Sequence, residues 1–118
     1  MIKGFAGASI WSEDLGNLLP FYRDTLGLNA SIETAGFVVF GDTSGPTLAL
    51  GTHSEVKGKS SDPARHMVAV TTDDVEAEFR RLKSQGVEFI EEPTKFDQVT
   101  IATCKDPEGN YVQIMQFG

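Results

Sequence analysis

The chain has 118 residues, enough for one small domain, and hydrophobic residues at 40% with charged residues at 23% are typical of a globular fold. The formal net charge of −7 excludes the basic face with which proteins bind a nucleic-acid backbone. The single cysteine excludes an intrachain disulfide, and no apolar run is long enough to span a membrane. Because the N-terminal residues lack a signal-peptide pattern, we predict a cytoplasmic protein.

The first half of the chain predicts four strands and one helix. The strands are expected at residues 5–11, 29–33, 36–41 and 47–51. A turn over residues 42–46 joins the last two strands. Ser12 or Asp14 can cap a helix after the first strand, and Gly27 ends it. Pro20 lies inside this helix and lacks an amide hydrogen, so we expect a short or distorted helix.

The second half repeats this plan. Strands are expected at residues 66–71, 87–90, 99–104 and 111–117. Residues 72–74 offer a helix N-cap, with Glu76 spaced as in a capping box, and Gly86 is a typical residue after a helix end. A turn over residues 105–110 joins the last two strands.

Both halves therefore have the order strand, helix and three strands. Module 1 covers about residues 1–54, residues 55–65 form a linker, and module 2 covers about residues 66–118. Because either module would be marginally stable alone, we expect both to join in a single domain over residues 1–118.

Two segments carry a family resemblance. Residues 21–28 read Phe-Tyr-Arg-Asp-Thr-Leu-Gly-Leu, and residues 106–116 read Asp-Pro-Glu-Gly-Asn-Tyr-Val-Gln-Ile-Met-Gln. With this layout, the chain resembles the vicinal oxygen chelate superfamily, which includes glyoxalase I, bleomycin-resistance proteins and extradiol dioxygenases. The resemblance implies an α+β fold in which two β-α-β-β-β modules form an open, cup-shaped, eight-stranded mixed sheet with helices outside. It also implies ligand binding in the cup and a homodimer.

Catalytic members of that superfamily hold a divalent metal ion through four side chains on the first and last strands of the modules. Alignment from the helix caps and turns places Gly7, Ala49, Met67 and Gln113 at these positions. Glycine and alanine supply no donor, a thioether is a weak ligand, and one amide cannot hold the ion alone. We therefore expect no metal ion and no cofactor.

His66 leaves one alternative open for the metal. It neighbours Met67, but successive residues of a strand point to opposite faces, so only a bulge would turn His66 into the cup. A metal set of His66 and Gln113 would also need a carboxylate, and no position predicted to face the cup carries one.

Strand alternation predicts the side chains that line the cup. The predicted ligand-binding residues are Phe5, Gly7, Ser9, Trp11, Ala49, Met67, Tyr111, Gln113 and Met115. Their strand neighbours, expected beneath the helices, are Ala6, Ala8, Ile10, Leu48, Leu50, Val112 and Ile114. The inward set suits a largely apolar ligand with a few hydrogen bonds, with Trp11 and Tyr111 stacking on a ring or a cation. The same side chains would also suit a collapsed cup or a dimer contact.

Three functions stay open at this point. A small-molecule-binding protein of the bleomycin-resistance type, sequestering an aromatic, amphipathic or cationic compound, agrees best with the missing metal ligands. A metal-dependent lyase, isomerase or dioxygenase would require a different strand register. An interaction module would fill the cup with its own side chains. No catalytic residue is predicted, and Cys104 is expected to be an inert buried thiol.

Overall fold

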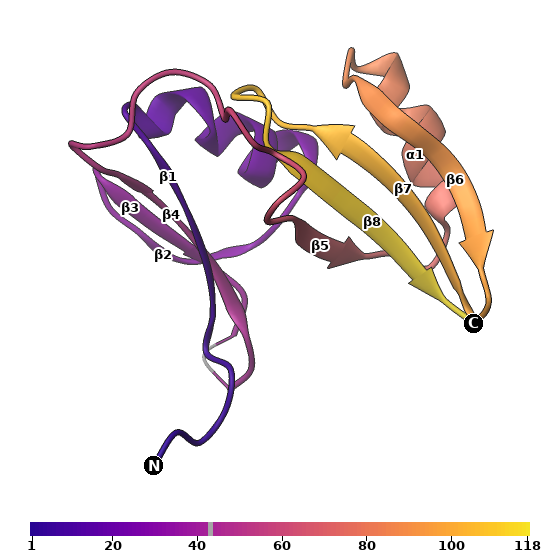
Figure 1. Ribbon diagram of the computed structural model, residues 1–118, viewed down its shortest axis with the longest axis horizontal. Coiled ribbons are helices and arrows are strands. Elements are labelled where there is room, and N and C mark those ends of the chain that lie inside the picture. The colour runs from indigo at the N-terminus through magenta and orange to yellow at the C-terminus, as the bar shows by residue number, and fades with distance from the viewer. Residues whose placement is uncertain (43) are drawn as a thin grey trace. The chain divides into compact units, whose positions relative to one another are not determined.

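The computed structural model describes residues 1–42 and 44–118, which divide into two compact units, Met1–Gly58 and Lys59–Gly118 (Figure 1). Each unit contains one open, four-stranded mixed sheet, so the predicted α+β class and the order strand, helix and three strands are confirmed. The boundary between the units falls in the segment predicted as a linker. The predicted turn over residues 42–46 includes residue 43, which lies outside the described residues.

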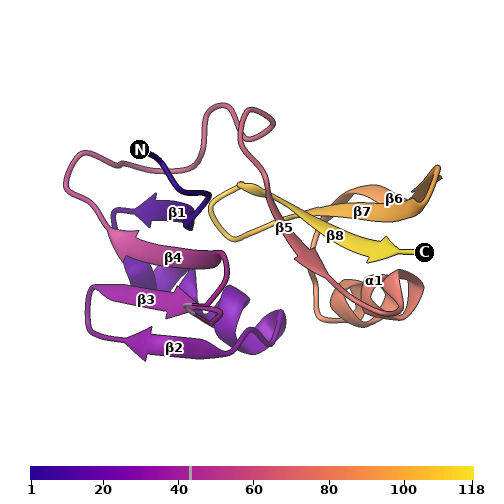
Figure 2. The ribbon, with the colours of Figure 1, turned by 90° about the horizontal axis from the view of Figure 1, so that it is seen from below.

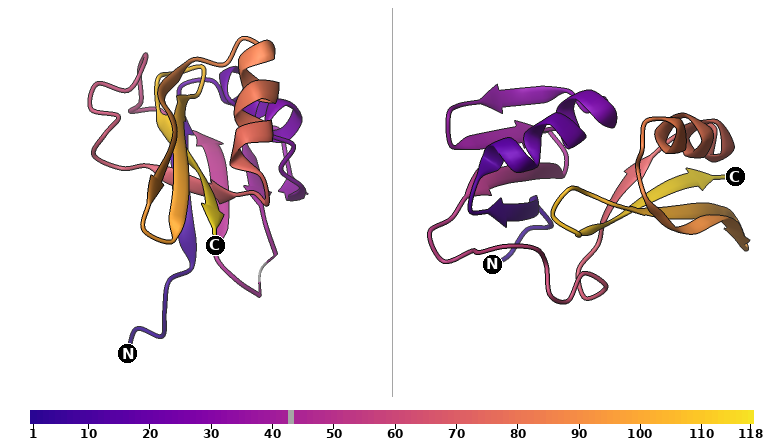
Figure 3. Two further views of the ribbon diagram at one scale, coloured as in Figure 1. Left: turned by 90° about the vertical axis from the view of Figure 1, so that its right-hand side faces the viewer. Right: turned by 90° about the horizontal axis from the view of Figure 1, so that it is seen from above.

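The sheet of the first unit has the strand order β1-β4-β3-β2 (Figure 2). Its strands are β1 (Gly7–Ser12), β2 (Ala30–Glu33), β3 (Phe37–Phe40) and β4 (Thr47–Thr52). Strand β1 runs parallel to β4, and the other neighbours are antiparallel. Two short helical segments, η1 (Leu15–Asn17) and η2 (Pro20–Thr25), lie over one face of this sheet (Figure 3).

Pro20 divides the helical region of the first unit, as the sequence predicts. Asp14 caps η1 by accepting a hydrogen bond of 2.9 Å from the amide of Gly16, but this 3₁₀ turn is only three residues long. Pro20 then starts η2, a six-residue π-helical segment, at a position where its missing amide hydrogen costs no helical bond. Between sheet and helices lies a core that includes Leu18, Tyr22, Val38 and Leu50, all fully buried.

The sheet of the second unit has the matching order β5-β8-β7-β6 (Figure 1). Its strands are β5 (Val68–Thr71), β6 (Phe89–Phe96), β7 (Val99–Lys105) and β8 (Tyr111–Phe117). The helix α1 (Val75–Ser84) lies against one face of this sheet (Figure 3). Asp74 caps α1 by accepting a hydrogen bond of 3.0 Å from the amide of Ala77.

Alternating residues of β7 and β8 form a core together with the buried face of α1. The side chains of this core are almost completely buried, and they include Val75, Leu82, Ala102, Cys104, Val112 and Ile114. The predicted burial of Leu48, Leu50, Val112 and Ile114 is therefore confirmed. The same prediction is wrong for Ala6 and Ala8, which are exposed, because Ala6 precedes β1 and β1 is an edge strand.

Strand β6 is longer than predicted. The expected strand at residues 87–90 extends in the structure from Phe89 to Phe96. Its pairing with β7 shifts register between Phe89 and Glu91, and again between Glu91 and Thr94. These shifts interrupt the simple alternation from which a strand is recognised in a sequence. Across the described ranges, no helix has both the length and the apolar character required to cross a membrane.

Candidate functional site

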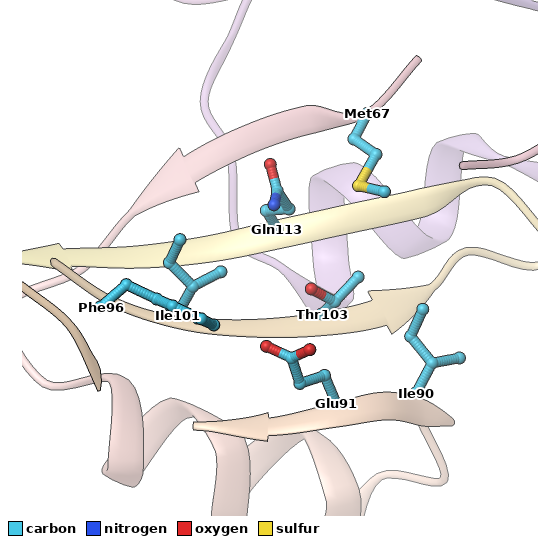
Figure 4. Close-up of a pocket in the computed structure, with 7 residues that line it drawn as sticks. All are labelled: Met67, Ile90, Glu91, Phe96, Ile101, Thr103 and Gln113. Carbon is cyan, nitrogen blue, oxygen red and sulfur yellow. The ribbon is translucent and has the colours of Figure 1, made fainter. Parts of the chain in front are cut away.

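A pocket of about 350 Å³ lies on the sheet face of the second unit that is opposite α1 (Figure 4). This volume falls in the range of roughly 300–1,000 Å³ that small-molecule sites occupy. Its apolar lining comes from Met67, Ile90, Phe96 and Ile101. Its polar lining comes from Glu91, Thr103 and Gln113. The pocket therefore combines an apolar wall with three groups that can form directional hydrogen bonds.

The three polar residues form one row across three neighbouring strands. Gln113 on β8 is paired with Thr103 on β7, and Thr103 is paired with Glu91 on β6. Directly paired residues on one face have Cβ atoms about 4.5–5.5 Å apart, so these side chains are direct neighbours. Figure 4 shows the carboxylate of Glu91 extending toward β7 between Ile101 and Thr103.

A β-bulge explains why two consecutive residues of β6 line the same pocket. Phe89 pairs with Cys104 and Glu91 pairs with Thr103, so Ile90 is an extra residue in β6. Phe89 lies on the α1 side, where its ring meets Phe79 edge to face at a centroid distance of 4.8 Å. The bulge thus leaves Phe89 in the core while both Ile90 and Glu91 line the pocket.

Burial within the pocket increases from its mouth to its floor. Glu91 is exposed, as are Met67 at 39% and Phe96 at 51% of their accessible surface. Gln113 is half-buried, and Thr103 is buried with 6% of its surface exposed. In residues 1–42 and 44–118, no side-chain hydrogen bond or ion pair engages Glu91, Thr103 or Gln113. These polar groups are therefore free to bind a ligand.

The structure divides the nine predicted ligand-binding residues between the two units. In the second unit, Met67 and Gln113 line the pocket. Tyr111 and Met115 flank Gln113 on the same face of β8, by strand alternation. The first unit contains Phe5, Gly7, Ser9, Trp11 and Ala49. Phe5 precedes β1 and is exposed, whereas the other four residues lie on the paired strands β1 and β4. Ligand binding by these nine residues stays a prediction.

Trp11 packs on the sheet of its own unit. It is paired with Gly51 on β4, and a methyl group added to Gly51 would overlap the indole ring. His53 meets the same ring edge to face at a centroid distance of 5.7 Å. The indole is 41% exposed, so one side of it remains accessible.

Five pocket residues were not predicted from the sequence: Ile90, Glu91, Phe96, Ile101 and Thr103. These residues lie on the two strands between the first and last strands of the module, whereas the metal positions implied by the resemblance lie on the first and last strands. Alternation along β7 would have identified Ile101 and Thr103, which pair with Met115 and Gln113. No sequence signal would have identified Glu91, because its orientation depends on the bulge at Ile90.

The residues do not form the metal centre of the catalytic superfamily members. In the described parts of the chain, no three His, Cys, Asp or Glu residues are grouped so that they could hold a metal ion. His66 precedes β5, is exposed and does not line the pocket. The positions predicted to face the cup carry no carboxylate, but Glu91 of β6, which was not among them, lies in the same row as Gln113. One carboxylate with one amide and one hydroxyl is nevertheless a poor donor set for a divalent ion.

Cys104 lies on the opposite side of β7 from the pocket. It is fully buried in the core beneath α1. Burial, and to a lesser degree the charge of Asp106, raises the pKa of this thiol to about 12. The thiol is therefore protonated at neutral pH and unsuited to nucleophilic chemistry.

Comparisons with known proteins bear on the family and the fold of this chain. The family model of the Glyoxalase/Bleomycin resistance protein/Dioxygenase superfamily matches residues 4–114. Over 43 residues the chain is 51% identical to the uncharacterised protein YurT of Bacillus subtilis (strain 168), a match that spans 36% of this chain and only 34% of YurT.

Solved structures share the fold at low sequence identity. TnmS3, an antibiotic binding protein from Streptomyces sp. CB03234, is 21% identical with a TM-score of 0.76, over 100% of this chain and 99% of its own. A glyoxalase/bleomycin resistance protein/dioxygenase from Nocardioides is 21% identical with a TM-score of 0.69, over 99% of this chain and 85% of its own.

Proposed function

Because this chain belongs to the Glyoxalase/Bleomycin resistance protein/Dioxygenase superfamily, we propose that it binds and sequesters a small, largely apolar molecule without a catalytic metal ion. The proposed site is the pocket of the second unit, which is lined by Met67, Phe96, Thr103 and Gln113 among others.

One observation carries this proposal: three polar side chains without partners in the described residues share an otherwise apolar pocket. A sheet face covered by other parts of the fold would need apolar residues or internally paired polar groups, whereas these three groups are left to water or to a ligand. Thr103 is the most deeply placed of the three, with 6% of its surface exposed. A ligand with matching polar groups would form hydrogen bonds with this row, while its apolar body would cover Met67 and Phe96.

Sequestration is favoured over turnover by the chemistry of the lining. The pocket residues include no nucleophile paired with a base, and their donors do not fit a metal centre. TnmS3, with the same fold, is described as an antibiotic binding protein, and a related role for this chain is part of the proposal. The proposal also includes a cytoplasmic location and a homodimer. The free thiol of Cys104 is compatible with a reducing compartment.

The test is a ligand screen observed by NMR on protein labelled with ¹³C at the methionine methyl groups. The chain has three methionines, of which Met67 lines the pocket and Met1 lies at the exposed N-terminus as an internal control. Planar aromatic and amphipathic compounds are expected to shift the Met67 resonance and leave Met1 unchanged. Treatment with a chelator is expected to leave binding unaffected.

Phe96→Ala should weaken binding of the compounds found in this screen by about tenfold, since it removes an aromatic wall of the pocket. Phe117→Ala makes the same truncation at an exposed residue of β8 that does not line the pocket, and it should have little effect. If no compound shifts Met67 in the folded protein, or if chelation abolishes binding, the proposal is wrong.

A further inference from the structure

We propose that Glu91 selects ligands that carry a protonated nitrogen, so that the pocket accepts organic cations with an apolar body. This inference rests on the binding function proposed above and specifies its ligand class. Thr103 and Gln113 would orient the cationic group beside the Glu91 carboxylate, while Met67 and Phe96 would contact the apolar body.

The first argument is the missing counter-ion of Glu91. In the part of the chain that the structure describes, no basic side chain forms an ion pair with this carboxylate. Lys105, the basic residue of β7, is paired with Glu88 at 3.1 Å. Lys95 lies on β6 opposite Thr100, which alternation places on the face of β7 away from the pocket. The described residues therefore supply no cation to neutralise Glu91.

The second argument is the cost of covering a carboxylate. An ionised carboxylate only accepts hydrogen bonds, and water satisfies it while the pocket is open. A ligand over Glu91 displaces that water, so it must supply donors, and a positive charge compensates the loss best. A ligand with only acceptors or with a negative charge would leave Glu91 unpaired and would be rejected.

The third argument distinguishes an organic cation from a metal ion. Hard divalent ions take six or more oxygen ligands, whereas this row offers three oxygen-bearing side chains, namely one carboxylate, one amide and one hydroxyl. The remaining lining is aliphatic, thioether and aromatic, and the Phe96 ring can also attract an organic cation through its π face. The net charge of −7 further favours the approach of cations.

The experiment compares 1-naphthylmethylammonium with 1-naphthalenemethanol, two probes with the same ring that differ in charge. Binding is measured by titration calorimetry and by the Met67 methyl resonance, in the wild-type protein, Glu91→Gln and Glu92→Gln. Both variants remove one charge from an exposed residue of β6, but Glu92 does not line the pocket. The ammonium probe is expected to bind the wild type about three- to tenfold more tightly than the alcohol.

Glu91→Gln should abolish this preference by weakening the ammonium probe more than the alcohol, whereas Glu92→Gln should retain the preference. Raising the ionic strength should weaken only the ammonium probe. Equal binding of both probes to the wild type, or equal effects of the two variants, would overturn the charge selection while the binding function stands. Displacement of the ammonium probe by Mg²⁺ alone would also overturn it, by assigning Glu91 to a metal. If neither probe nor any screened compound shifts Met67, the binding function itself fails.

Discussion

The two units have the same strand order, yet the sheet faces opposite their helices differ in chemistry. In the first unit this face presents Ala49 and Gly51 beside the indole of Trp11, which covers Gly51. In the second unit the corresponding face presents the polar row of Glu91, Thr103 and Gln113. The shared order of elements therefore sets the scaffold, whereas single residues on the outward face decide whether this face is covered by a side chain of the same unit or left open.

The helices of the two units differ for a similarly local reason. The second unit has a regular helix, α1, with acidic residues in its first turn and basic residues in its last. The first unit has two short segments, because Pro20 prevents a continuous hydrogen-bonded helix. Both arrangements still bury one apolar face on a sheet, so the core tolerates a distorted helix if its apolar residues remain in place.

The largest predicted effect contrasts the two faces of the second sheet. Cys104 should react about a thousandfold more slowly with iodoacetamide than an ordinary thiol, because burial raises its pKa from 9.0 to about 12. A cysteine introduced by Glu91→Cys, at the exposed mouth of the pocket, should react at an ordinary rate. Mass spectrometry after timed alkylation at pH 8 measures both rates. In urea the two thiols should react alike. Fast labelling of Cys104 in the native protein would contradict its place on the buried face of the sheet beneath α1.

The next prediction tests whether the two cores contribute equally to the stability of the protein, although the first unit has two short helical segments in place of a regular helix. Leu50→Ala in the first unit and Leu82→Ala in the second remove side chains that are at most 1% exposed. Each variant should lower the free energy of unfolding by about 2–5 kcal/mol in urea titrations followed by circular dichroism. Ile32→Ala, at a residue that is 46% exposed, serves as the control and should have a small effect. A loss below about 1 kcal/mol for Leu50→Ala would indicate a loosely packed first core.

The sequence predicts the scaffold better than the pocket. Periodicity and turn residues placed the strands, the α1 region and the distortion at Pro20, since these depend on local backbone preferences. Met67 and Gln113 were identified because they lie on or beside strands with regular alternation. Glu91 was not identified, because β6 contains Pro93 and register shifts. A single extra residue in a strand moves the residues that follow it to the opposite face of the sheet. Bulges form through pairing with the neighbouring strand, which periodicity within one segment does not reveal.

A third prediction tests the covered face of the first unit. Gly51→Ala should displace the Trp11 ring, because the added methyl group overlaps the indole. Overpacking of this kind should cost about 1–3 kcal/mol of unfolding free energy. Trp11 is the only tryptophan, so its fluorescence emission reports the displacement directly. The control is Gly36→Ala, since a methyl group at Gly36 meets no atom within 4 Å. An unchanged emission spectrum in Gly51→Ala would show that Trp11 does not pack over β4.

The smallest predicted effects compare the helix caps of the two units. Asp74→Ala removes the acceptor for the Ala77 amide at the start of the ten-residue helix α1, and it should destabilise the protein by about 1 kcal/mol. Asp14→Ala removes the matching bond to Gly16, but there the cap serves a single 3₁₀ turn. Its loss should therefore cost about half a kcal/mol or less. Asp74→Asn retains a side-chain acceptor and should recover most of the stability in urea titrations. Equal losses for both alanine variants would mean that the short helical turn of the first unit depends on its cap as strongly as α1 does. Helix length would then not explain a difference between the caps of the two units.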